Sequence, residues 1–512
     1  MAGTRSIWQD TFTIAPRPAL GEHLTTDVCV IGAGIAGLTV AYTLAKAGKS
    51  VVVLDLAQIG SGESGHTTAH LANALDDRYL ALEKARGVDA TRLTAEAHSA
   101  AIDQIEHIVR SERIDCDFAR LDGFLFLGGD DSPKLLEDER DASHRAGLDG
   151  TELVDRLPIR GDEAGPALRY PRQGRFHILK YLDGLARAIE GAGGRIFGDS
   201  KVEKIEGGTP AMVTTASGCT VGADDVVVCT NGAISDMVVT HVKQAPYRTF
   251  AVALRVPKGA VPDALYWDTT DPYHYIRIHP LDDAHDALIV GGEDHKTAHE
   301  DDAGDRFDCL EDWAREHFVR GAAQDAPRIA QWSGQVLETN DGLAFIGRNP
   351  DGAEHVWLAT GDSGMGMTHG TIAGILLPAL IAKGTHRWAA LFDPKRITLH
   401  GTELLRIAKE GADVALQYAD YVTPGQVSDA DDIPAGEGRV LRRGAHKIAV
   451  YKAQDGTLHE CSAVCTHMKC IVDWNTAEKS WDCPCHGSRF DAYGTVVSGP
   501  ATMDLDQVMP GE

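Results

Sequence analysis

The chain has 512 residues, of which 43% are hydrophobic and 24% charged, so disorder, collagen and coiled coil are excluded as its main architecture. A single hydrophobic core stops growing at about 250–300 residues, and we therefore expect two or three domains. The formal net charge of −26 repels phosphate backbones and anionic membrane surfaces, which argues against nucleic acid as a partner.

The first elements along the chain form a strand, helix, strand unit. The apolar pattern predicts a strand at Asp27–Ile31, a helix at Leu38–Ala47 and a second strand at Ser50–Asp55. The first strand and the helix are joined by the glycine-rich segment Gly32-Ala33-Gly34-Ile35-Ala36-Gly37. This order is typical of a dinucleotide-binding fold.

Each part of this segment has a physical role. Gly32 makes the tight turn, Gly34 lets a pyrophosphate approach the backbone, and Gly37 lets the helix pack closely on the strand. The helix N-terminus stabilises the anion. Asp55, at the end of the second strand, is placed to hold ribose hydroxyls, so we predict a site for FAD or NAD.

Further elements alternate between helices and strands. The most apolar stretch, Ile372–Ala382, is about half as long as a bilayer span and contains Pro378, so we predict a buried helix and no membrane span. The N-terminus has no apolar secretory segment, and we expect the cytoplasm. The remaining expected elements are helices at 75–112, 177–192 and 397–421, strands at 195–197, 201–205, 226–229 and 357–360, and an antiparallel sheet over 247–290.

Five of the ten cysteines crowd into the last 52 residues. Two loops contain Cys465-Thr-His467 and Cys483-Pro-Cys-His486. Two thiolates and two imidazoles can hold a [2Fe–2S] cluster with histidines on one iron. Zinc also accepts two cysteines and two histidines, but its usual order places both cysteines before both histidines.

Several segments of the first part resemble FAD-dependent enzymes of the D-amino-acid oxidase (DAO) superfamily. These are DVCVIGAGIAGLTVAYTLAKAG from Asp27, the small-residue loop at 60–69, Cys229-Thr-Asn-Gly232, Asp341-Gly-Leu-Ala-Phe-Ile-Gly347 and Thr360-Gly-Asp-Ser-Gly-Met-Gly-Met367. The resemblance covers about residues 25–395 and implies FAD as the cofactor. The contacts it implies are Gly32, Gly34, Ile35, Ala36, Gly37, Asp55, Ser64, His66, Thr67, Val202, Thr230, Gly232, Gly361, Gly364, Met365, Gly366 and Met367.

Two histidines lie in the small-residue loop region. The family often has arginine where His66 stands, and some relatives link flavin covalently through a histidine near here. Neither His66 nor His70 is in register with that histidine. Covalent linkage, a polar contact near the flavin and an ordinary surface histidine all stay open as interpretations.

The segments CTHMKC and CPCHGSRF resemble the two boxes of a Rieske domain. The resemblance implies that Cys465 and Cys483 ligate one iron and that His467 and His486 ligate the other. It also implies a disulfide between Cys470 and Cys485. Ser488 matches a serine that bonds to a cluster sulfide. Phe490 stands where high-potential members carry tyrosine, so we expect a potential below the respiratory type.

The expected fold class is α/β plus all-β. We expect a Rossmann-like FAD-binding domain interleaved with an antiparallel-sheet substrate domain, followed by a small β Rieske domain. The flavoprotein would span 1–395, a helical connector 396–424 and the Rieske domain 425–512. Within the flavoprotein, the FAD-binding parts are 25–75, 178–240 and 335–395, and the substrate-sheet parts are 76–177 and 241–334.

The combination predicts a dehydrogenase for an amine or an N-substituted amino acid, with an external electron acceptor. An NAD(P)H-driven reductase supplying an oxygenase needs a second dinucleotide motif, which is missing. A non-catalytic redox sensor is the third possibility. The pocket candidates are Tyr273, Tyr275 and Arg277, which share one face of a strand, together with His295.

Overall fold

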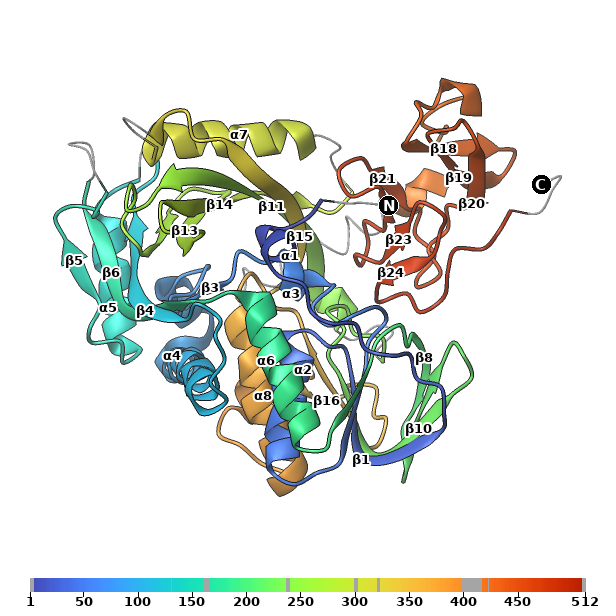
Figure 1. Ribbon diagram of the computed structural model, residues 1–512, viewed down its shortest axis with the longest axis horizontal. Helices are drawn as coiled ribbons and strands as arrows, with labels where there is room; N and C mark the ends of the chain where they lie inside the picture. The colour runs from blue at the N-terminus through green and yellow to red at the C-terminus, as the bar shows by residue number, and fades with distance from the viewer. Residues whose placement is uncertain are drawn as a thin grey trace.

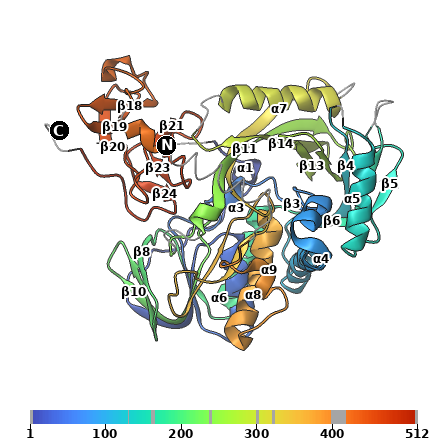
Figure 2. The same ribbon diagram turned by 180° about the vertical axis from the view of Figure 1, so that it is seen from behind.

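The computed structural model describes residues 4–129, 131–159, 165–235, 240–298, 303–319, 323–397, 417–421 and 423–508. Two large sheets with their helices form the body of the molecule. A smaller all-β module, formed by the C-terminal residues, lies against one side of this body (Figures 1 and 2). Within the described residues no helix is long and apolar enough to cross a membrane.

The first sheet carries the dinucleotide unit and has eight strands. Its order is β16-β17-β10-β1-β2-β7, and β9 and β8 extend from β10 as an antiparallel pair. The central neighbours from β17 to β7 are parallel, because the chain returns through crossover helices. The strands are β1 (Leu24–Ile31), β2 (Val51–Leu54), β7 (Arg195–Phe197), β8 (Val202–Glu206), β9 (Ala211–Thr215), β10 (Thr220–Val228), β16 (Phe345–Arg348) and β17 (Val356–Thr360).

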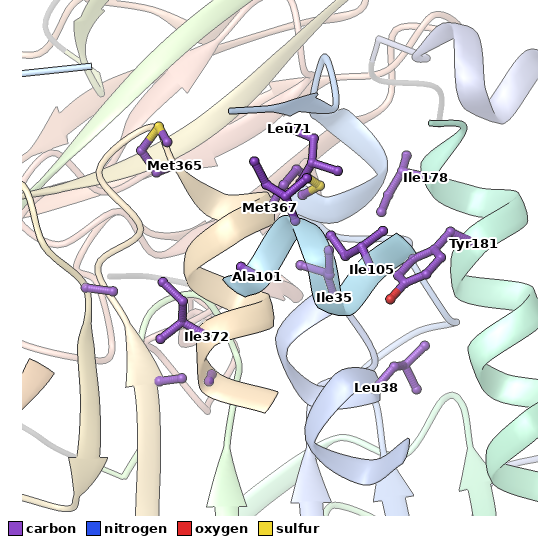
Figure 3. Close-up of a cluster of buried hydrophobic side chains, with 14 of the residues drawn as sticks. Ile35, Leu38, Leu71, Ala101, Ile105, Ile178, Tyr181, Met365, Met367 and Ile372 are labelled. Carbon is purple, nitrogen blue, oxygen red and sulfur yellow. The ribbon is translucent and has the colours of Figure 1, made fainter. Parts of the chain in front are cut away.

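Three helices lie side by side against this sheet: α2 (Ile35–Lys46), α6 (Ile178–Gly191) and α8 (Gly366–Lys383) (Figure 1). The long helix α4 (Tyr79–Ser111), which is interrupted at Gly87, packs on α8. Their apolar faces meet in one core, drawn in Figure 3, where Ile35 of α2 lies near Met367 of α8 and Leu38 of α2 lies on the side of α6. The apolar stretch at 372–382 is therefore a buried helix, as predicted.

The second sheet has nine strands in the order β15-β11-β14-β13-β12-β4-β6-β3, with β5 paired to β6. All of its pairings are antiparallel except β4 with β12. Helix α7 (Ala303–His317) covers one face (Figure 1). The strands are β3 (His70–Leu71), β4 (Ala119–Phe126), β5 (Glu152–Val154), β6 (Ala167–Arg175), β11 (Gln244–Pro257), β12 (Leu265–Asp268), β13 (Tyr275–Pro280), β14 (His285–Lys296) and β15 (Arg328–Thr339).

The C-terminal module consists of two small antiparallel sheets with their own core. The expected helix at 397–421 and the connector at 396–424 lie largely outside the described residues, although the short helix η3 (Tyr418–Tyr421) is described. The strands are β18 (Glu437–Arg443), β19 (His446–Lys452), β20 (Leu458–Ser462), β21 (Asp473–Asn475), β22 (Ser480–Asp482), β23 (Arg489–Asp491) and β24 (Val496–Ser498). The remaining short elements are α1 (Ile7–Thr11), α3 (Glu63–His66), α5 (Lys134–Arg145), α9 (Ala389–Phe392), η1 (His241–Lys243) and η4 (Ala430–Asp432).

A buried ion pair fastens the loop between β15 and β16. The guanidinium of Arg396 donates to both carboxylate oxygens of Asp341 at 2.8 Å, and Arg86 contacts the same carboxylate. Burial alone would raise the pKa of Asp341, but the two guanidinium groups outweigh it and hold that pKa at about 2. Its ionised form therefore stabilises the fold.

We expect Asp341→Asn to lower the free energy of unfolding by about 2 kcal/mol at pH 7. The folded-state pKa lies below the ordinary value, so this stability is complete above about pH 4 and is lost as the pH falls toward 2. The difference in melting temperature between wild type and variant should shrink accordingly at low pH. The exposed Asp149→Asn variant is the control, and an equal loss there would contradict the assignment.

Candidate functional site

The turn between β1 and α2 is built as the glycine pattern predicts. Gly32 has a φ of 105°, a conformation that favours glycine. A methyl group on Gly37 would lie 1.9 Å from the Gly32 carbonyl oxygen, so only glycine lets α2 begin this close to the strand. The helix N-terminus therefore faces the space above the turn, where an anion would be stabilised.

Asp55 follows β2 directly, at the same edge of the sheet. Its carboxylate accepts hydrogen bonds from the backbone N–H groups of Ala33 at 2.6 Å and Ala57 at 2.9 Å. Burial is the main influence on Asp55 and raises its pKa, and these two bonds oppose that effect. The Asp55 carboxylate therefore fixes the glycine turn beside β2 and also lines the nucleotide-binding part of the cavity.

A cavity of about 700 Å³ extends from this turn to the second sheet. It passes the loop between β17 and α8 (residues 361–365), the closing loop, where Gly361 and Gly364 have φ values of 72° and 73° and lead into the N-terminus of α8. The predicted FAD contacts that line it are Gly32, Gly34, Ile35, Ala36, Asp55, Ser64, His66, Thr67, Val202, Thr230, Gly361, Gly364, Met365, Gly366 and Met367.

Two predicted contacts, Gly37 and Gly232, are not among the lining residues. Gly37 packs against Gly32, as described above. Gly232 faces the C-terminal module, where a methyl group on it would lie 3.0 Å from the ring of Pro500. A further part of the wall, formed by the C-terminal segment between Thr495 and Thr502, was not predicted from the sequence. No local motif marks it, because another module supplies it.

The substrate-side candidates divide into two groups. Tyr273 and Tyr275 line the cavity with their rings 5.5 Å apart. Arg277 does not, which corrects the expectation from strand alternation. Its guanidinium lies buried over the ring of Trp8 and donates to backbone carbonyls such as that of Ala69, at 2.7 Å. Burial lowers its pKa to about 9.

His295 is also not among the lining residues, and its ring stacks on Phe250 at 5.3 Å under α7. Because successive residues of a strand alternate in direction, its neighbour Asp294 lines the cavity instead. Asp294 and Asp76, whose carboxyl groups repel each other within the cavity, were not predicted from the sequence. No motif surrounds either residue.

The two histidines of the small-residue loop have different surroundings. The ring of His66 lies on the cavity wall, 3.1 Å from the Gly62 carbonyl oxygen. His70 bonds through Nε2 to the Ile276 carbonyl oxygen at 3.1 Å, and burial lowers its pKa to about 3. His70 is therefore neutral at physiological pH.

The four predicted cluster ligands converge from two loops, one between β20 and β21 and the other between β22 and β23. The free thiols of Cys465 and Cys483 are buried, and the rings of His467 and His486 lie 5.1 Å apart. Nδ1 of His486 is buried with no hydrogen-bond partner in the described part of the chain, as a metal-binding nitrogen would be before metal binds. This donor set fits a [2Fe–2S] cluster.

A disulfide joins Cys470 and Cys485, as expected from the sequence. Their sulfur atoms and that of Cys483 lie within 4.8 Å of one another, so the bridge ties the two ligand loops beside the cluster site. The hydroxyl of Ser488 hydrogen-bonds the Cys465 thiol and accepts the N–H of Ala501 at 3.0 Å. It is positioned to tune the cluster as a neighbouring hydrogen-bond donor.

The C-terminal module contacts the flavin side of the body through these ligand loops. Gln335, which lines the large cavity, donates to the carbonyl oxygen of Gly487 at 2.9 Å and accepts from Asn231 at 3.1 Å. The ring of His241 lies 4.9 Å from that of His467, and its Nε2 bonds the Ala233 carbonyl oxygen at 3.0 Å.

Buried charges surround this contact. Arg248 of β11 and Arg489 of β23 lie near Glu478, at 3.4 and 3.8 Å. Burial raises the pKa of Glu478, but the two arginines more than offset this and lower it. Arg489 and Glu478 belong to the same module, whereas Arg248 of the body reaches Glu478 only in this docked arrangement, so this pair helps to fix the orientation of the module.

Residues 27–380, well over half of the chain, match the family described as FAD dependent oxidoreductase, or DAO. The chain belongs to the DAO family of FAD-dependent oxidoreductases. Residues 423–509 of this DAO-family enzyme match the Rieske [2Fe-2S] domain. Its two cofactors are therefore FAD, for which the large cavity is shaped, and a [2Fe–2S] cluster, for which the paired cysteines and histidines are suited.

Relatives share both parts or the first part alone. YhfW of Bacillus subtilis (strain 168), described as a Rieske 2Fe-2S iron-sulfur protein, is 30% identical over 98% of this chain and 97% of its own. Gamma-glutamylputrescine oxidoreductase of Escherichia coli (strain K12) is 29% identical over 77% of this chain and 92% of its own. L-proline dehydrogenase from P. horikoshii has the same fold, with a TM-score of 0.62 at 19% identity, covering 74% of this chain and 98% of that chain.

Proposed function

We propose that this DAO-family enzyme is a dehydrogenase that oxidises a C–N bond of an amine or N-substituted amino acid and passes the electrons to an external acceptor. When bound, FAD supplies a two-electron acceptor for the substrate and the Rieske cluster supplies a one-electron carrier. We further propose residues 1–395 as the substrate-oxidising part and 425–512 as the electron-transferring part, joined by 396–424.

The observation that carries this proposal is the contact between the cavity and the cluster loops. Asn231 and Gln335 border the cavity, and Gln335 bonds directly to Gly487, the residue after the ligand His486. His241 forms a second bridge from Ala233 to the ring of His467. These contacts support a short path for electrons between the two cofactor sites.

The other residues of the site position and enclose the substrate. Tyr273 and Tyr275 form the wall of the cavity on the second sheet, and the closing loop with Gly364 faces them. Ordered side chains here exclude water from the reacting carbon.

Anaerobic addition of an amine to the holoenzyme tests the proposal. We expect the visible flavin bands to bleach first, followed by the low-temperature EPR signal of a reduced Rieske cluster. Rapid bleaching by NADH, with none by amines, would favour the NAD(P)H-driven reductase. Bleaching by neither reductant would favour the redox sensor, and bleaching without cluster reduction would contradict the coupling of the two sites.

A variant pair sharpens this test. Gln335→Leu removes the bond to Gly487, so we expect slower appearance of the EPR signal with unchanged bleaching of the flavin bands. Gln331→Leu, on the same strand but exposed, is the matched control. Equal rates in both variants would remove Gln335 from the proposed route.

A further inference from the structure

Two carboxyl groups line the substrate end of the cavity, and no lysine or arginine among the described residues opposes them there. Asp76 and Asp294 line it beside Tyr273, Tyr275 and Trp267. Among the described residues that line the whole cavity, Lys201 is the only lysine or arginine. It lies beside Val202 at the nucleotide end, where Asp504 pairs with it at 2.7 Å.

Asp76 lies against the closing loop. The Tyr273 hydroxyl donates to its Oδ2 at 2.9 Å, and a methyl group on Gly364 would lie only 2.0 Å from that same oxygen. The carboxylate is enclosed by protein yet open to the cavity. Enclosure raises its pKa to about 7, and nearby Asp77, Asp294 and Asp362 add to that effect. A bound cation would relieve this repulsion.

Asp294 lies near the end of β14. Thr249 hydrogen-bonds its carboxylate, and the hydroxyls of Thr249 and Tyr275 are 2.5 Å apart. Its Oδ1 has no hydrogen-bond partner in the described part of the chain. Enclosing a carboxylate oxygen without a hydrogen-bond donor destabilises the site, and an N–H group of a ligand would supply the missing donor.

The positive groups nearest Asp294 are engaged elsewhere. Arg306 lies 3.5 Å from Glu293, and its Nη1 donates to the Glu293 carbonyl oxygen. His274 bonds Asp268 at 2.8 Å. Neither residue lines the cavity, and the guanidinium of Arg277 is covered by Trp8. Within the described part of the chain, the substrate end therefore offers no guanidinium for a bidentate bond to a carboxylate.

We propose that the substrate is a cationic alkylamine, such as a diamine or polyamine, rather than an α-amino acid, and that Asp294 and Asp76 select it. This inference rests on the proposed dehydrogenase function. The aromatic rings of Tyr273, Tyr275 and Trp267 complement the carboxylates, because cations bind favourably over aromatic faces. The overall charge of −26 also steers cations toward the protein.

The step balances as a dehydrogenation. The carbon next to nitrogen loses a C–H bond together with its electron pair, and the nitrogen loses a proton, so R–CH₂–NH₃⁺ becomes R–CH=NH₂⁺ with release of two electrons and two protons. FAD, the cofactor of the established family, takes the electron pair. Water then converts the iminium to an aldehyde and ammonium.

Two measurements test the proposal on the flavin-loaded enzyme. Titration with 2,5-dimethylhexane-2,5-diamine, a dication that has N–H groups but no C–H bond next to nitrogen and so cannot be oxidised to an imine, should perturb the flavin absorbance, and glutarate should not. In Asp294→Asn we expect the apparent Kd of the dication to rise on the order of tenfold to a hundredfold, with flavin content unchanged. Asp283→Asn, an exposed change of the same charge, should have no effect.

Steady-state assays with butane-1,4-diamine provide the second readout. Its kcat/KM should exceed those of sarcosine and proline, and should fall in Asp294→Asn and recover partly in Asp294→Glu. If Asp294→Asn does not retain flavin, Asp76→Asn replaces it in both measurements. Faster oxidation of the amino acids, or an unchanged Kd for the dication, would overturn the substrate class alone. Binding of the dication with no oxidation of any amine would instead overturn the dehydrogenase function.

Discussion

Cys483→Ser should abolish electron delivery to cytochrome c while leaving flavin reduction by an amine intact. Cytochrome c is a one-electron protein acceptor too large to enter the substrate cavity, so we expect its electrons to come through the C-terminal module. Cys483 is buried beside Cys465, and serine supplies no thiolate to the cluster. We expect no Rieske EPR signal, normal anaerobic bleaching of the flavin and acceptor reduction at background rate.

Cys461→Ser is the control for this variant. Cys461 is also a buried thiol of the C-terminal module, but it lies outside the two ligand loops. Its variant should keep the EPR signal and the rate of acceptor reduction. Undiminished cytochrome c reduction by Cys483→Ser would show that electrons leave the flavin directly, and the module would then need another role.

Gly37→Ala should weaken the binding of FAD strongly. The added methyl group would meet the Gly32 carbonyl oxygen at 1.9 Å, so α2 must shift away from the turn that holds the pyrophosphate. Overpacking of this kind costs about 1–3 kcal/mol. If the cost falls on the bound state, FAD affinity drops by up to about a hundredfold. Fluorescence titration of the apoprotein with FAD measures the change.

Gly191→Ala is the matched substitution, because a methyl group there meets nothing within 4 Å. Gly191 ends α6 and lies away from the nucleotide turn. Its FAD affinity and melting temperature should match those of wild type. Wild-type FAD affinity in Gly37→Ala would mean that the turn can relax without loss of the pyrophosphate contact.

The parts of the site that were predicted from the sequence each lie within one short segment of the chain. The turn from Gly32 to Gly37 and the cluster loops around Cys465 and Cys483 each need a few residues at fixed spacing. The same holds for the strand, helix, strand unit, whose bounds the structure shifts by only a few residues at either end.

The parts that were not predicted depend on distant segments. Asp76 and Asp294 meet only because the second sheet folds over the closing loop, and no motif surrounds either residue. The wrong placement of Arg277 in the cavity has a related cause. Alternation along a strand tells which residues share a face, but not how far along that face the cavity extends before Trp8 covers it. The contacts of Gln335 and His241 likewise depend on how two modules dock.

The C-terminal module supplies the part of the flavin cavity wall that lies between Thr495 and Thr502. The chain is synthesised from its N-terminus, so the nucleotide site stays open on this side until the last residues emerge and fold. FAD can thus enter before the module docks, and docking then closes the site behind it. Flavin bound at that stage can leave only when the module undocks, so docking slows its release.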